Sequence, residues 1–176
     1  MKKIRWGILS SAKIGTEKVI PAMQQSGTGE IQALASRSHE TAKKICGELG
    51  IPKSYGSYEE LLADPEIDAV YNPLPNHLHV PWTIEAARSG KHVLCEKPIA
   101  LTLADGDQMV QLAAEKRLKV AVAHQAVYLP RIQQLKLMLE EGIIGQIETI
   151  HATGKQDRRG GGYCQCRTAC SQVLGG

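Results

Sequence analysis

Short apolar runs alternate with longer amphipathic segments over residues 4–123. The first run, Ile4 to Leu9, meets a turn of small residues and then a helix-like segment through Met23. The same order recurs in 30–35 with 40–49, in 68–71 with 78–88 and in 92–95 with 103–116, and the run 118–123 closes the series. Strands that alternate with helices of ten or more residues predict an α/β fold with a Rossmann-type, doubly wound parallel sheet.

Residues typical of helix ends support these boundaries. Gly50 and Gly90 stand where helix C-caps are expected, and Thr102 with Asp105 resembles a capping box. Asn76 is the expected N-cap of the helix that follows the third apolar run.

The alternation stops after Gln125, where the pattern predicts a helix from Pro130 to Glu141 and then a β-branched strand from Gln146 to Thr153. Residues 160–176 show neither helical nor strand periodicity. We therefore expect a nucleotide-binding domain over 1–125, only the start of a second, α+β domain over 126–162, and an unstructured tail over 163–176.

Composition narrows the class of partner. Lys and Arg number 21 against 18 Asp and Glu, and no basic stripe is present, which argues against nucleic acid and favours a small molecule. No apolar run reaches the length of about 18 residues that a membrane span needs. These features predict a soluble, cytoplasmic protein in which Cys46 and Cys95 are buried apolar residues.

Ligands of open parallel sheets bind at the carboxyl ends of the strands, so the residues after each predicted strand are the candidate site. After the first strand, Ser10, Ala12 and Gly15 occupy the spacing of the G-x-G-x-x-G motif, with Ser11, Lys13 and Ile14 between them. Small residues here let the backbone approach a pyrophosphate. Because two of the three glycines are absent, a small-residue turn in another α/β fold is an equal alternative on this motif alone.

The second strand ends in Ser36, Arg37 and Ser38, where an NAD-binding domain normally places an acid for the ribose 2′-hydroxyl. No acid is present. Arg37 can bind a 2′-phosphate through its planar guanidinium, and the serines can donate hydrogen bonds to it. This predicts NADP(H) as the favoured cofactor, with NAD(H) as the alternative.

The third strand leads into Asn72 and then Pro73, Leu74, Pro75, Asn76, His77, Leu78 and His79, where two prolines restrict the backbone. The histidines lack a companion ligand pattern, so no metal site is expected.

The fourth strand leads into Cys95, Glu96, Lys97 and Pro98. A charged pair after a buried strand is costly unless it is paired or reaches a cleft, and a lysine there can act as a general acid or base. A surface ion pair without a function is the alternative, but all four features fall at one predicted edge of the sheet.

The sequence at this edge resembles the Gfo/Idh/MocA oxidoreductases, the family of glucose–fructose oxidoreductase and inositol dehydrogenase. The resemblance covers residues 4–162 and is most specific at 90–98 and 75–79. It implies that Lys97 is catalytic and exchanges a proton with a substrate hydroxyl, and that Glu96 and Pro98 shape its surroundings. It also implies that Asn76 and His79 line the nicotinamide and its ribose, and that Ser36 and Arg37 surround the adenosine 2′ position.

The family's second domain follows a glycine run like that at 160–162, holds the substrate and often mediates homo-oligomers, but it does not follow here. The cysteines Cys164, Cys166 and Cys170 could form a small zinc site, although a reading-frame slip or truncated gene copy fits the abrupt change of composition better.

Three hypotheses for the function remain. They are an NAD(P)-dependent oxidoreductase, or fragment of one, acting on the CH–OH group of a sugar, cyclitol or related polyol; a catalytically inactive NADP(H)-binding fragment; and a cofactor-free interaction module.

Overall fold

The structure, a computed structural model, describes residues 3–149. The chain divides into two units, Met1–His124 and Gln125–Gly176, and each is described by itself. The first unit contains a six-stranded parallel sheet in the order β3-β2-β1-β4-β5-β6. The strands are β1 (Ile4–Leu9), β2 (Gly29–Ala35), β3 (Lys53–Tyr55), β4 (Ala69–Asn72), β5 (His92–Cys95) and β6 (Val120–Val122). This order is that of the doubly wound dinucleotide-binding fold, so the predicted fold class is confirmed.

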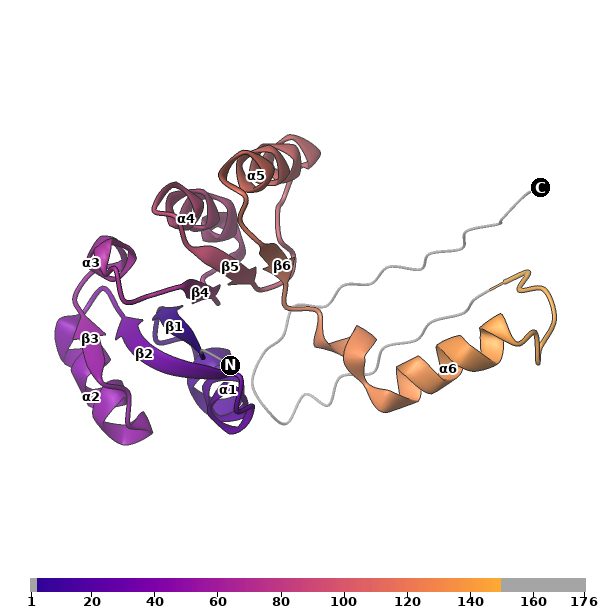
Figure 1. The fold of residues 1–176 in the computed structure, drawn as a ribbon, viewed down its shortest axis with the longest axis horizontal. Coiled ribbons are helices and arrows are strands. Elements are labelled where there is room, and N and C mark those ends of the chain that lie inside the picture. Colours follow the sequence, from indigo (N-terminus) through magenta and orange to yellow (C-terminus); the bar gives the residue numbers. More distant parts are fainter. Residues whose placement is uncertain (1–2, 150–176) are drawn as a thin grey trace. The chain divides into compact units, whose positions relative to one another are not determined.

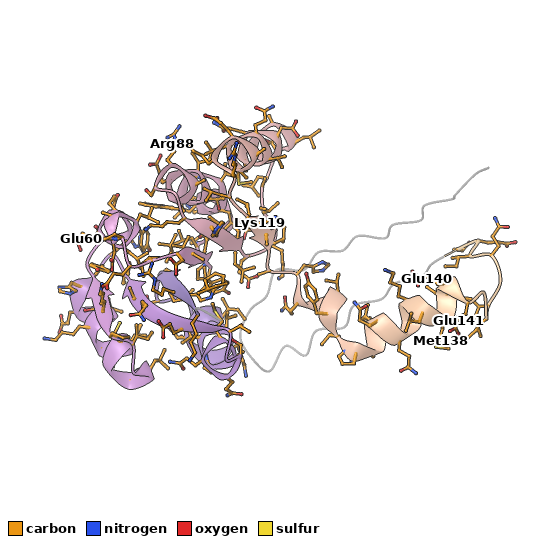
Figure 2. All side chains as sticks on the ribbon, in the orientation of Figure 1. Glu60, Arg88, Lys119, Met138, Glu140 and Glu141 are labelled. Atoms are coloured by element: carbon orange, nitrogen blue, oxygen red, sulfur yellow. The ribbon has the colours of Figure 1, made fainter. Side chains whose placement is uncertain are left out.

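Helices cover both faces of this sheet (Figure 1). One face packs against α3 (Tyr58–Ala63), α4 (Asn76–Arg88) and α5 (Leu103–Lys116). The other packs against α1 (Ile20–Gln25) and α2 (His39–Leu49), and a π-helical turn, η1 (Gly15–Val19), precedes α1. Figure 2 shows Arg88 and Glu60 on the outer surfaces of α4 and α3.

The core forms two apolar layers because neighbouring residues of a strand point to opposite faces. Leu9, Val70 and Val93 pack on the α3 and α4 side, whereas Ile8 and Tyr71 pack on the α1 and α2 side. All four residues of β4 are buried. The centre of the sheet is therefore fixed by packing from both sides, and the strand ends next to it are held in place.

The helix-end residues confirm several predicted boundaries and correct one. Gly50 adopts a left-handed conformation with φ of 65° at the end of α2, and the Thr102 hydroxyl oxygen accepts a hydrogen bond from the Asp105 backbone N–H at 3.2 Å. The prediction that Asn76 caps α4 was wrong. Pro75 is the capping residue, with an extended ψ of 147° and no side-chain hydrogen bond, and Asn76 is already helical. Proline suits this position because it has no N–H that needs a partner.

Two elements of the first unit, β3 and α3, have no counterpart in the sequence prediction. β3 has three residues, too few for an alternating pattern, and it forms through its pairing with β2. The six-residue α3 carries a sequence signal, however. The Ser57 hydroxyl oxygen accepts from the Glu60 N–H at 3.2 Å, and Glu60 accepts from the Gly56 N–H at 3.1 Å, which resembles the reciprocal bonds of a capping box.

The described part of the second unit consists of a 3-10 turn, η2 (Gln125–Tyr128), and the predicted helix α6 (Pro130–Glu140). The strand predicted from residue 146 is not formed over 146–149, which was therefore a wrong prediction for these residues. A strand needs a neighbouring strand to bind its backbone groups, and residues 125–149 contain none. Residues 150–153 and the tail lie outside the described residues. In the part that is described, no helix is long and apolar enough to cross a membrane.

Candidate functional site

The residues that follow the strands line up at one edge of the sheet. The Ser10 backbone N–H donates to the Ala35 carbonyl at 2.9 Å, and the Ser36 N–H donates to the Tyr55 carbonyl at 3.2 Å. On the other side of β1, the Glu96 N–H donates to the Asn72 carbonyl at 3.0 Å. These bonds extend the ladders one residue past the strands, so the turns with the candidate residues lie at the same edge.

The turn after β1 has a backbone shaped for glycine. Ser10 has a φ of 96°, which L-residues other than glycine rarely adopt, and its hydroxyl oxygen accepts from the Ala12 N–H at 3.3 Å. Gly15 is buried, and a Cβ there would lie 3.6 Å from Tyr71 Cε1 and 3.7 Å from Pro73 Cγ. Ser10 therefore takes a backbone conformation that the first glycine of a G-x-G-x-x-G loop adopts without strain, and Gly15 leaves room for an ordinary van der Waals contact with Tyr71 and Pro73.

The turn after β2 leads directly into α2. Ser36 is buried and its hydroxyl oxygen lies 3.4 Å from the Ser38 N–H, while Ser38 caps the helix by accepting from the Thr41 N–H at 3.3 Å. Arg37 is exposed between them. Arg37 directly precedes Ser38, the N-cap of α2. Burial raises the pKa of Tyr58, and the positive charge of Arg37 opposes this shift. A cation beside a helix N-terminus suits an anionic group such as a 2′-phosphate.

The turn after β4 depends on Asn72, whose importance the sequence analysis missed. This fully buried side chain accepts from the Leu74 N–H at 3.2 Å and donates to the His79 carbonyl and to the Thr83 hydroxyl at 3.1 and 3.3 Å. It thereby joins the strand end to α4. A polar residue that ends an otherwise apolar strand was the signal that could have identified it.

The turn after β5 carries Glu96, Lys97 and Pro98. The buried Tyr71 hydroxyl donates to Glu96 Oε1 at 2.8 Å, and the Lys97 backbone N–H lies 3.4 Å from Glu96 Oε2. Lys97 is exposed, and the peptide bond between Lys97 and Pro98 is cis. Burial raises the pKa of the preceding Cys95 thiol to about 11, so this cysteine is an apolar core residue and not a nucleophile.

The remaining predicted residues fall into three groups by burial. Lys13, Pro75, Asn76 and Pro98 are exposed at this edge, whereas Ser11, Ala12 and Ile14 are partly buried in the first turn. Leu74 and His79 are buried, and both ring nitrogens of His79 face backbone carbonyls. Cofactor contacts for all of these residues stay predictions. Within residues 3–149, no three His, Cys, Asp or Glu side chains gather as metal ligands would.

A separate pocket lies at the opposite, amino-terminal ends of the strands. Trp6, His92 and Leu94 line it together with Lys119. Lys119, labelled in Figure 2, directly precedes β6. His92 accepts from the Lys119 N–H at 2.9 Å and so helps to hold the start of β6. Open parallel sheets bind their ligands at the carboxyl edge, and the small-residue turn, Arg37 and Lys97 all lie there, so that edge is the candidate site.

Residues 4–124 match the model of a family described as an oxidoreductase family with an NAD-binding Rossmann fold, GFO_IDH_MocA. The chain belongs to this family. The resemblance seen in the sequence is therefore confirmed.

Several relatives of this family member are dehydrogenases or reductases of sugars. The chain is 40% identical over 142 residues to the 1,5-anhydro-D-fructose reductase of Ensifer adhaerens, covering 81% of this chain and 42% of the relative. It is 56% identical over 94 residues to D-xylose 1-dehydrogenase (NADP(+)) 2 of Haloferax volcanii, covering 53% of this chain and 29% of the relative.

Solved structures show the same similarity. A 3-ketoreductase from Actinomadura kijaniata, crystallised with NADP and TDP-benzene, superposes with a TM-score of 0.79 at 34% identity. The match covers 84% of this chain and 46% of that structure. The chain thus spans less than half the length of these relatives.

Proposed function

We propose that this chain binds NADP(H) at the carboxyl edge of its sheet and supplies the cofactor-binding part of an oxidoreductase. The substrate class is the CH–OH group of a sugar, cyclitol or related polyol, or the corresponding carbonyl. Relatives named as acting on xylose, anhydrofructose and a dTDP-sugar support the class. The observation that carries the cofactor assignment is Arg37, exposed beside the N-terminus of α2 where the NAD-specific acid would stand.

The residues present fit a dinucleotide. The Ser10 turn provides the glycine-like backbone, and the buried Gly15 packs the start of the following helical turn against Tyr71 and Pro73. The pyrophosphate would be held by backbone N–H groups of residues 11–15, and the 2′-phosphate by Arg37 and the hydroxyl groups of Ser36 and Ser38. When bound, the nicotinamide supplies the hydride acceptor or donor.

Lys97 provides the acid–base group in this proposal. When the substrate's CH–OH group is oxidised to a carbonyl, the neutral Lys97 amine would accept the hydroxyl proton, and when the carbonyl is reduced the Lys97 ammonium would return it. The exposure of Lys97 at the end of β5, next to a carboxylate fixed by Tyr71, supports this role.

Fluorescence titration with NADPH and NADH tests the cofactor assignment directly. We expect saturable binding of NADPH and weaker binding of NADH, and no binding at millimolar NADPH would overturn the proposal. The catalytic assignment is tested by NADP⁺ reduction over a panel of sugars and polyols. Turnover that is lost in Lys97→Met with NADPH affinity retained supports it, and equal turnover in this variant contradicts it.

A further inference from the structure

Two buried side chains bind the residues on either side of Lys97. The Tyr71 hydroxyl donates to the Glu96 carboxylate at 2.8 Å, and His79 Nδ1 lies 2.7 Å from the Pro98 carbonyl oxygen. Tyr71 is fully buried and His79 is 1% exposed. The exposed lysine is therefore carried on a short turn that the protein interior holds at both flanking residues.

The contacts of His79 connect two turns of the site. Its Nε2 lies 2.6 Å from the Leu74 carbonyl oxygen in the turn after β4, while Nδ1 faces Pro98 in the turn after β5. Carbonyl oxygens only accept hydrogen bonds, and a neutral imidazole has one N–H to donate. Which ring nitrogen donates depends on the tautomer, and His79 contacts both turns in either form.

Tyr71 connects the same turn to the turn after β1. Its ring carbon Cε1 would lie 3.6 Å from a Cβ at Gly15, while its hydroxyl binds Glu96 Oε1. The other oxygen of Glu96 lies 3.4 Å from the Lys97 N–H. A single side chain thus relates the backbone that would hold the pyrophosphate to the backbone that carries Lys97.

We propose that Tyr71 and His79 are positioning residues that fix the Glu96–Pro98 turn, and with it Lys97, relative to the nicotinamide end of the bound cofactor. The inference rests on the proposed function for its role and on the observed hydrogen bonds for its geometry. Placement matters because a displacement of about 1 Å in a reacting group can cost about a hundredfold in rate.

The test compares two ligands that differ at the nicotinamide end. NADPH reaches both ends of the site, whereas adenosine 2′,5′-bisphosphate carries the 2′-phosphate and lacks the nicotinamide.

We expect NADPH affinity to fall about tenfold in Tyr71→Phe and in His79→Gln, the equivalent of one lost hydrogen bond. Tyr71→Phe keeps the aromatic ring beside Gly15. Affinity for adenosine 2′,5′-bisphosphate should change less than about twofold. His77→Gln, an exposed change in the same helix, serves as the matched control and should alter neither affinity.

Amide hydrogen exchange of residues 94–99 gives a second measurement that needs no cofactor. Faster exchange confined to this segment in both variants supports the positioning role, even if wild-type protein fails to bind NADPH and the proposed function falls. Unchanged exchange overturns it, as does an equal loss of affinity for both ligands, which would indicate general unfolding. If His79→Gln does not fold, Tyr71→Phe decides the outcome.

Discussion

The ammonium group of Lys91 lies 2.7 Å from the carbonyl oxygen of Asp64, and 2.8 Å from that of Ile67. Lys91 precedes β5 and is 7% exposed, and the loop that it binds precedes β4. Burial lowers its pKa, whereas the nearby carboxylates of Asp64 and Asp68 oppose this shift. The lysine therefore joins the starts of two neighbouring strands whose far ends carry the turns of the candidate site.

Lys91→Met should destabilise the first unit by about 2–4 kcal/mol because it leaves two buried carbonyl groups without their donor. Urea denaturation followed by circular dichroism measures this loss. Lys43→Met, an exposed change on α2, should stay within about 0.5 kcal/mol of wild type. Equal stability of the two variants would show that the Lys91 bonds contribute nothing.

Asp64 should make the fold sensitive to acid. Its burial would raise its pKa, but hydrogen bonds from Lys53, the Glu66 N–H and Tyr55 outweigh this effect and lower the pKa to about 2. Because the pKa is lower in the folded state, the carboxylate stabilises the fold above pH of about 4, and this contribution is lost as the pH falls toward 2.

Asp64→Asn should therefore remove about 2 kcal/mol of the stability difference between pH of about 5 and pH of about 2. Denaturation midpoints measured across this range give the profile. Asp107→Asn, at an exposed position of α5, should leave the acid-dependent loss as it is in the wild type. If Asp64→Asn lost as much stability as wild type on acidification, the role of Asp64 would be contradicted.

The conformation of Ser10 predicts opposite tolerance for two substitutions. Glycine adopts a φ of 96° without strain. Ser10→Gly should therefore stay within about 0.5 kcal/mol of the stability of wild type, because the relief of backbone strain offsets the loss of the hydroxyl hydrogen bond and the greater flexibility of the unfolded chain. The β-branched side chain in Ser10→Val should cost about 1–3 kcal/mol. Thermal unfolding of the pair measures the difference, and equal stability would refute the strained backbone.

Arg37 should determine the preference for the phosphorylated cofactor. Arg37→Ala removes charge-assisted bonds to the 2′-phosphate, so NADPH affinity should fall at least about tenfold, while NADH affinity should change little. Fluorescence titration with both cofactors measures the ratio. Lys43→Ala, at an exposed position of the following helix α2, tests for a general effect of positive charge. A matching loss in Arg37→Ala for NADH would argue against recognition of the 2′-phosphate.

Local patterns in the sequence predicted most of the first unit because each long element buries one face or both. The bounds of β1, β5 and α5 agree with the prediction residue for residue. The spacing of Ser10, Ala12 and Gly15 marked the turn that follows β1, and the position of Arg37 after β2 followed from the regular length of the βαβ unit. These features depend on residues that are close together in the chain, so they can be read from the local sequence pattern.

Tertiary structure alone decided which buried polar groups organise the site. Tyr71 meets Glu96 from 25 positions away, and His79 meets Pro98 from 19, so no local pattern indicates either pair. The role of Asn72 likewise depends on the approach of α4 to the end of β4. A polar group buried by folding must find its partner wherever the packing brings one, and that partner is set by the order of the strands in the sheet.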